Sequence, residues 1–170
     1  EFRRVLFRSP GFVEVFCGPM RSGKSLEIIT LLNKIQYHSE AKILALKHSV
    51  DKRHLTNSEE CYIESRSGEA KLRWPATFVD DADKIFHYLN KDHNVVVIDE
   101  AQFFQADIVD AVKALSEKGL YVLIGGLDTD FRKKNFGWMQ ELMSLATEVH
   151  KLTAICEYKN GTKCNNLATL

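Results

Sequence analysis

The eight residues GPMRSGKS, at positions 18–25, decide how this sequence is read. They match the pattern G-x-x-x-x-G-K-[ST] at every fixed position. In that pattern the glycines let the backbone fold around phosphates, the lysine reaches the β- and γ-phosphates, and the serine hydroxyl binds Mg²⁺. A β-rich stretch (11–17) precedes the motif, and apolar residues at helical spacing follow it over 24–39. We therefore predict that the whole loop binds the phosphates of a nucleotide, with Ser25 as a magnesium ligand: Gly18, Pro19, Met20, Arg21, Ser22, Gly23, Lys24 and Ser25.

A second element of such a site lies in VVVIDE, residues 95–100. A run that is apolar at every position is typical of a strand buried on both faces of a parallel sheet. Asp99 at its end supplies the carboxylate that a phosphate-binding loop needs to hold magnesium. Taken alone, Asp99 is also compatible with a turn residue at a strand end. The two elements together predict a Mg-nucleotide site.

Strand-like and helix-like segments alternate along the chain, which predicts an α/β domain with a mainly parallel sheet flanked by helices. The polar stretch 48–73 is predicted to be a mobile connection. Asp80 is predicted to cap a helix that runs through Leu89. Gly119 is predicted to end a second helix, over residues 106–118. The predicted strands are 11–17, 41–47, 76–79, 94–99, 120–126 and 148–155, and the predicted helices are 24–39, 80–89, 106–118 and 138–145.

Composition narrows the function classes. The chain has 170 residues, 45% of them hydrophobic, which fits one ordinary domain with a real core. A formal net charge of zero argues against a general nucleic-acid binder. No apolar run reaches the roughly 18 residues of a membrane span, and four sparse cysteines favour reduced thiols or metal ligands, so we expect a cytoplasmic protein with no membrane partner. The first ten residues, EFRRVLFRSP, are expected to be a non-native leader outside the fold.

Two other classes of phosphate-binding protein fit less well. A small GTPase needs N-K-x-D to read the base, and the nearest string, NKDH at 90–93, has His93 where aspartate is required. The string DEAQ at 99–102 resembles the DExD box of helicases, but one domain of this length lacks a second motor lobe. A kinase of small molecules or a stand-alone ATPase remains.

Read in order, GPMRSGKS, VVVIDEAQFF (95–104), GLDTDF (126–131) and KLTAIC (151–156) resemble the type II thymidine kinases over about residues 11–168. The resemblance implies a P-loop core of RecA-like type and a small zinc-binding subdomain. It implies transfer of the γ-phosphate of ATP to the 5′-hydroxyl of thymidine or deoxyuridine in nucleotide salvage, with Mg²⁺, by a homotetramer. We accordingly expect a kinase core over 11–150 and an incomplete zinc and lasso subdomain over 151–170.

The resemblance also assigns the phosphate side of the site. Asp99 matches the magnesium carboxylate, and Glu100 matches the general base that takes the proton of the 5′-hydroxyl. One carboxylate engaged by a metal leaves its neighbour free to accept a proton, although Glu100 is also compatible with a solvated helix start. Asp51 and Arg53 match a D-x-R segment that reaches phosphates and metal, where surface charge is the alternative. Gln102 is assigned to the same phosphate side.

On the nucleoside side, Phe131 matches the ring that packs against thymine, and Met20 matches a residue lining the base. Without the resemblance, Phe131 is a loop anchor. Phe103, with Phe104 beside it, is expected either to wall the nucleoside pocket or to belong to the core. These three assignments (Met20, Phe103 and Phe131) define the predicted nucleoside-binding set.

The last residues carry a weaker metal signal. Cys156 and Cys164 are spaced like a lengthened zinc knuckle, although free thiols remain an alternative. Relative to the family pattern, the chain is expected to be truncated before a second ligand pair and before a loop that closes over thymidine. The alternative function is therefore a nucleotide-binding module or ATPase without nucleoside turnover. A nucleic-acid-stimulated ATPase would instead respond to single-stranded DNA.

Overall fold

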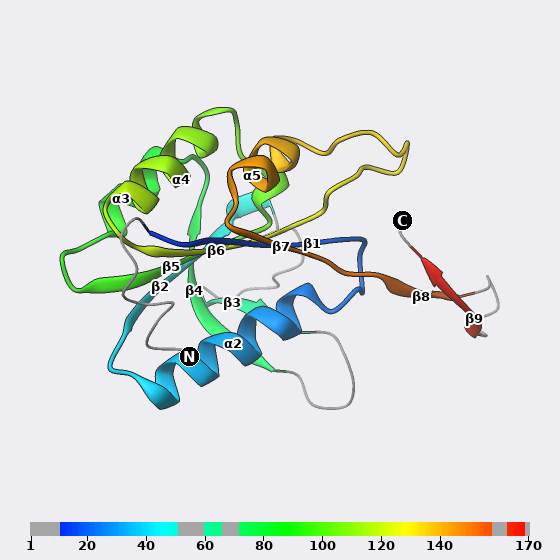
Figure 1. Ribbon diagram of the computed structural model, residues 1–170, viewed down its shortest axis with the longest axis horizontal. Coiled ribbons are helices and arrows are strands. Elements are labelled where there is room, and N and C mark those ends of the chain that lie inside the picture. Colours follow the sequence, from blue (N-terminus) through cyan, green and yellow to red (C-terminus); the bar gives the residue numbers. More distant parts are fainter. Residues whose placement is uncertain (1–10, 51–59, 66–71, 158–162, 169–170) are drawn as a thin grey trace.

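Seven strands form one sheet in the order β3-β4-β2-β5-β6-β1-β7 (Figure 1). The computed structural model describes residues 11–50, 60–65, 72–157 and 163–168. Every neighbouring pair in this sheet is parallel except β3 with β4, which is antiparallel. The mainly parallel α/β fold predicted from the alternation of segments is confirmed. The strands are β1 (Val13–Cys17), β2 (Lys42–His48), β3 (Cys61–Glu64), β4 (Arg73–Val79), β5 (His93–Asp99), β6 (Tyr121–Gly126) and β7 (Glu148–Lys151).

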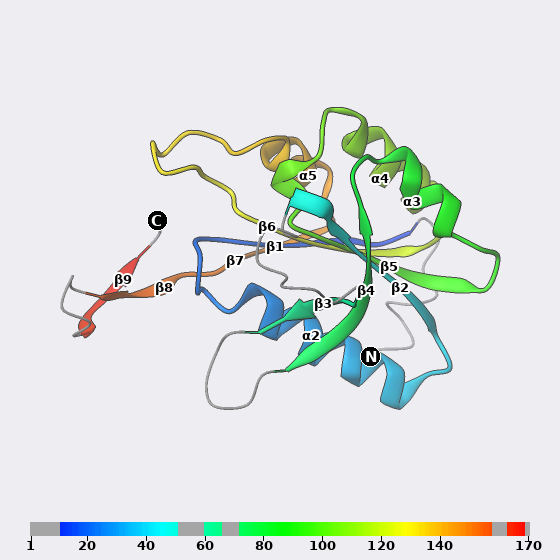
Figure 2. The same cartoon turned by 180° about the vertical axis from the view of Figure 1, so that it is seen from behind.

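Helices cover both faces of this sheet. α2 (Lys24–His38) lies on one face, and α3 (Asp83–Tyr88), α4 (Asp107–Glu117) and α5 (Met139–Leu145) lie on the other (Figures 1 and 2). Two apolar clusters follow from this layering, one under α2 and one under the other three helices. The central strands β5 and β6 contribute to both clusters because alternate side chains point to opposite faces. Their uninterrupted apolar runs are explained by burial on both sides.

The predicted connection over 48–73 is wrong in part, because it contains a strand. β3 pairs antiparallel with β4, which begins at Arg73 rather than at residue 76. Cys61 and Ile63 are buried while their neighbours Tyr62 and Glu64 are half-buried, which is the alternation of a strand with one covered face. Polar residues on both sides hid this short alternation. Residues 51–59 and 66–71 of the same stretch lie outside the described part of the chain, as does the predicted leader over 1–10.

The predicted cap of α3 is also wrong. The residue before the helix is Ala82, which offers no capping side chain, and the backbone N–H in the first turn is bonded by Asp81 rather than by Asp80. Asp81 accepts a hydrogen bond from the backbone N–H of Lys84, at 2.9 Å, whereas Asp80 forms an ion pair with the Lys84 side chain. The predicted end of α4 is confirmed. The helix ends just before Gly119, whose φ of 80° is the left-handed conformation that favours glycine.

A separate antiparallel hairpin follows the sheet. β8 (Ala154–Glu157) pairs with β9 (Lys163–Ala168), and in both views the hairpin projects beyond the end of the main sheet (Figures 1 and 2). In the described ranges, no helix is both long enough and apolar enough to cross a membrane.

Candidate functional site

The sheet topology brings the phosphate-binding loop close to Asp99. The loop follows β1 and Asp99 ends β5, and β6 lies between these two strands. β6 ends in Gly125 and Gly126, so this strand adds no side chain of its own between the loop and Asp99. A Cβ atom at Gly125 would lie 3.0 Å from Asp99 Oδ1 and 2.8 Å from Ile28 Cδ1. The glycine therefore lets the Asp99 carboxylate and the first turns of α2 approach each other.

Lys24 lies over its own loop. Its ammonium donates hydrogen bonds to the carbonyls of Gly18 at 3.0 Å and Pro19 at 2.6 Å, and to Ser22 Oγ at 3.4 Å. The loop turns at positive φ at Gly18 (139°), Arg21 (60°) and Gly23 (91°). A side chain at Gly18 would also collide with the carbonyl oxygen of Leu152, which fixes glycine at this position.

Three carboxylates surround this lysine electrostatically. Burial lowers the pKa of Lys24 from its ordinary value, while the negative charges of Glu100, Asp99 and Asp128 act in the opposite direction. Carboxylates at or just after the ends of β5 and β6 therefore act on an ammonium at the start of α2. Lys24 and these three carboxylates are therefore grouped beside the phosphate-binding loop.

Mg²⁺ fits the donors found here. The Asp99 carboxylate is buried at the end of β5. Ser25 is the second residue of α2 and directly follows Lys24. Carboxylate and hydroxyl oxygens are the ligands that Mg²⁺ prefers, together with phosphate oxygens and waters.

Glu100 is held in an unusual backbone conformation. Its φ of 59° and ψ of 39° place a non-glycine residue in the left-handed region, between β5 and the short helix η2 (Ala101–Phe103). Such conformations cost about 1–3 kcal/mol and cluster at functional sites. Its carboxylate is half-buried and accepts a hydrogen bond from Gln102 Nε2 at 2.6 Å.

The predicted nucleoside side is divided between surface and core. Met20 is 70% exposed and Phe131 is 85% exposed, with the Arg132 guanidinium 5.0 Å from the Phe131 ring centre. Two such exposed apolar side chains are available to a ligand. Phe104 belongs to the core under α3, α4 and α5, whereas Phe103 is half-buried and packs edge-to-face on Phe136 at 5.6 Å.

The four remaining predicted residues lie away from the phosphate-binding loop in the sequence. Asp51 and Arg53 lie outside the described residues. Cys156 and Cys164 stand on β8 and β9 and adjoin Glu157 and Lys163, which pair across the hairpin. The backbone thus brings the two cysteines to facing strands.

Sequence reasoning missed two residues beside this site. Asp128 follows β6, is 7% exposed, and pairs with Lys151 at 3.1 Å, while its other oxygen, Oδ1, is buried without a hydrogen-bond partner in the described part of the chain. His48 ends β2, stacks edge-to-face on Phe104 at 4.7 Å, and has its pKa lowered chiefly by burial. Asp128 was detectable, because it comes two residues after a second buried strand, β6, much as Asp99 ends β5. His48 gave no such signal.

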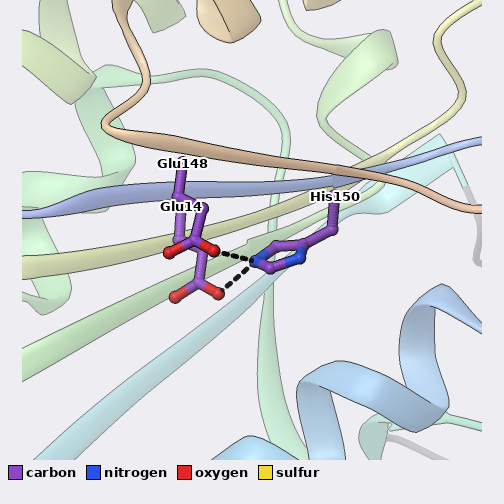
Figure 3. A group of neighbouring side chains, drawn as sticks. All are labelled: Glu14, Glu148 and His150. Atoms are coloured by element: carbon purple, nitrogen blue, oxygen red, sulfur yellow. Dashed lines mark hydrogen bonds and ion pairs between the residues drawn. The ribbon is translucent and has the colours of Figure 1, made fainter.

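A second group of ionisable side chains lies away from the loop. Glu14 on β1 and Glu148 on β7 are paired in register, and both carboxylates point to His150 Nε2, at 2.6 and 3.5 Å (Figure 3). The three ligand atoms lie within 4.8 Å of one another, a donor set that a divalent cation accepts. The group is also satisfied internally, since the Tyr121 hydroxyl donates to Glu14. It therefore acts as a cluster of polar contacts that ties the edge strand β7 to β1.

We expect Tyr121→Phe to lower the free energy of unfolding by about 1–3 kcal/mol, because a buried carboxylate oxygen loses its donor. Burial raises the pKa of Tyr121 above its ordinary value of about 10, and the hydrogen bond to Glu14 is the next largest cause. The stability contributed by this hydroxyl is therefore fully present below about pH 10 and is lost as the pH rises through the folded-state value. Urea unfolding at several pH values measures both effects. Tyr37→Phe, at an exposed tyrosine, is the control, and equal losses for the two variants would contradict the prediction.

Comparison with known proteins gives a further line of evidence on the family to which the chain belongs. The family model described as "Thymidine kinase" matches residues 11–169. A thymidine kinase of Mycoplasma mobile is 39% identical over 161 residues, covering 95% of this chain and 74% of that protein. One of Mesomycoplasma hyopneumoniae is 40% identical over 147 residues, covering 86% and 76%. Among solved structures, the Legionella pneumophila ATPase DotB matches with a TM-score of 0.52 at 11% identity, over 93% of this chain and 45% of that one, a likeness of fold alone.

Proposed function

We propose, because the chain belongs to the thymidine kinase family, that it transfers the γ-phosphate of ATP to the 5′-hydroxyl of thymidine or deoxyuridine. The observation that carries this proposal is the grouping of Lys24, Asp99 and Glu100 at one edge of the sheet, around a complete phosphate-binding loop. The loop and Lys24 bind the phosphates of ATP. Ser25 and Asp99 would hold Mg²⁺, which neutralises charge on the phosphate oxygens when bound.

Glu100 is the proposed general base. Asp99 and Glu100 are adjacent, but Asp99 is buried at the strand end and Glu100 is half-buried after it, in the left-handed conformation. This difference supports a division of roles, in which Asp99 serves the metal and Glu100 accepts the proton of the attacking hydroxyl. Glu100 Oε2 is already hydrogen-bonded to Gln102, which leaves Oε1 for the substrate.

The acceptor nucleoside is proposed to bind against Phe131 and Met20. Both side chains are large, apolar and exposed, which a folded protein tolerates where a ligand binds. Aromatic stacking on a base contributes about 1–3 kcal/mol, so Phe131 supplies a useful share of binding. Phe103 supports this side indirectly, through its contact with Phe136 on the same loop. Asp51 and Arg53 are proposed to contact the phosphates from the segment after β2.

The test of this function is the nucleoside dependence of ADP formation. We expect ADP to form from Mg-ATP when thymidine is added, with thymidine 5′-monophosphate appearing in equal amount. Deoxyuridine should substitute for thymidine, and single-stranded DNA should not stimulate the reaction. ADP formation that ignores thymidine would identify a stand-alone ATPase, and stimulation by DNA would identify a nucleic-acid-dependent one.

We also propose zinc at the hairpin, with Cys156 and Cys164 as two of four ligands. Thiolate sulfurs suit zinc, and facing strands bring the two residues together, but a structural zinc site takes four protein ligands. We expect metal analysis of a chain extended beyond Leu170, so that it supplies the second ligand pair, to find zinc, and Cys156→Ser in that chain to lower the zinc content severalfold. Cys61→Ser, at a buried cysteine on β3, is the control. Zinc content that is equal in the two variants would contradict this assignment.

Family membership further leads us to propose a homotetramer that works in the cytoplasm. Light scattering of the purified protein tests the first part, because a tetramer has four times the 19.4 kDa mass of one chain. Fractionation of cells that express the chain tests the second.

A further inference from the structure

Gln102 forms a bridge between Glu100 and the loop after β6. Its Nε2 donates to Glu100 Oε2 at 2.6 Å, and its Oε1 accepts a hydrogen bond from the backbone N–H of Leu127 at 3.0 Å. We propose that Gln102 is a positioning residue that holds the Glu100 carboxylate for proton transfer, rather than a ligand of the phosphates. This inference rests on the proposed function for its kinetic consequences, although the bridge itself can be tested without turnover.

Both ends of the Gln102 amide are used, and the orientation of the amide follows from its partners. The Leu127 N–H can only donate, and an ionised Glu100 can only accept. A rotated amide would place its oxygen against the carboxylate and its NH₂ group against the N–H. Gln102 is 2% exposed, so water cannot replace either bond. The side chain is therefore fixed in one orientation, with little room for contact with a phosphate.

Glycines at both ends of the loop 127–136 pack closely against Gln102. A Cβ atom at Gly126 would lie 2.9 Å from Gln102 Oε1, and a side chain at Gly137 would collide with the Gln102 carbonyl oxygen. Gly137 also has a φ of 56°, in the left-handed region. Close approach to the Gln102 side chain at Gly126 and to the Gln102 backbone at Gly137 explains why glycine is found at both positions. η2 and the loop are thus packed as one unit, which the contact of Phe103 with Phe136 extends.

This unit connects the proposed base to the proposed nucleoside side. The loop 127–136 carries Phe131, and η2 follows Glu100 directly. A general base must lie within hydrogen-bond reach of the proton that it takes, and a glutamate side chain has several rotamers. Tying one carboxylate oxygen through Gln102 to Leu127 restricts those rotamers. It also fixes the carboxylate relative to the loop on which the acceptor is proposed to bind, as productive geometry requires.

The kinetic test is a double-mutant cycle on this chain. Gln102→Met keeps the side-chain length and removes both hydrogen bonds, and the same change at exposed Gln105 is the control. We expect Gln102→Met to lower kcat by ~10–100-fold, with the Kd of Mg-ATP changed less than about threefold, because a positioning residue acts on the chemical step. In a Glu100→Gln background the same change should cost almost nothing more, because the partner that it positions is already inactive.

Three kinetic results would overturn the inference. One is equal losses of kcat from Gln102→Met in both backgrounds, which would indicate a general structural role. A second is a weakened Kd for Mg-ATP at unchanged kcat, which would make Gln102 a phosphate ligand. The third is unchanged kcat and Kd. A wild-type chain without thymidine-dependent ADP formation would instead refute the proposed function, and the bridge would then be decided by spectroscopy.

The spectroscopic test uses the Gln102 side-chain amide protons in ¹⁵N-labelled protein. A hydrogen bond to a carboxylate shifts such a proton downfield and slows its exchange with solvent. We expect Glu100→Ala to move this resonance upfield and to speed its exchange at least severalfold, while Glu117→Ala, at an exposed glutamate on α4, leaves both unchanged. This variant keeps Gln102 and its packing. An amide resonance that does not respond to Glu100→Ala would show that the bridge is absent in solution.

Discussion

Glu100→Gln should lower kcat by ~10²–10⁴-fold, the usual contribution of a general base, while the affinity for Mg-ATP stays the same. The substitution is isosteric, and the new side-chain oxygen still accepts the hydrogen bond from Gln102 Nε2, so the local fold is kept. What is lost is the capacity to take the proton of the attacking hydroxyl. Steady-state kinetics with thymidine as the varied substrate, together with calorimetric titration of Mg-ATP, measures the two quantities separately.

The matched control is Glu117→Gln, at an exposed glutamate at the end of α4, for which we expect unchanged kinetics. Near-normal turnover of Glu100→Gln would refute the base assignment. Asp128 would then be the next candidate, because it is a buried carboxylate that acts electrostatically on Lys24 and has one oxygen without a hydrogen bond in the described part of the chain.

The part of this site that sequence alone predicts is the part that is local in the chain. The loop 18–25 is contiguous, and its glycines are needed for backbone reasons that do not depend on the rest of the fold. Asp99 is predictable because the apolar run before it is typical of a strand buried on both faces. The family membership inferred from four ordered motifs is confirmed by the match over residues 11–169.

The contacts that the sequence does not predict join distant segments. The role of Gln102 depends on Leu127, which is 25 positions away, and on glycines at both ends of the next loop. The ion pair of Asp128 with Lys151 depends on β6 and β7 both lying beside β1 in the sheet. β3 was missed because a four-residue strand between polar segments carries too few apolar positions to show a period. These contacts depend on how strands and loops pack in the sheet, and the order of the strands cannot be read from any short stretch of sequence.

Lys24→Ala should fail in a different way from Glu100→Gln, with ATP affinity and turnover reduced together. The ammonium is a partly buried cation on the phosphate-binding loop, and a charge-assisted hydrogen bond of this kind contributes about 1.5–3 kcal/mol. We therefore expect the Kd of Mg-ATP to rise by ~10–100-fold and kcat to fall as well, because charge on the transferred phosphoryl group also loses its partner. Lys34→Ala, at an exposed lysine on the same helix, should change neither. Because Lys24 also bonds the carbonyls of Gly18 and Pro19, thermal unfolding of both variants is needed to separate loss of fold from loss of charge. A Lys24→Ala protein that unfolds normally and binds Mg-ATP with wild-type affinity would show that the loop binds phosphate through its backbone alone.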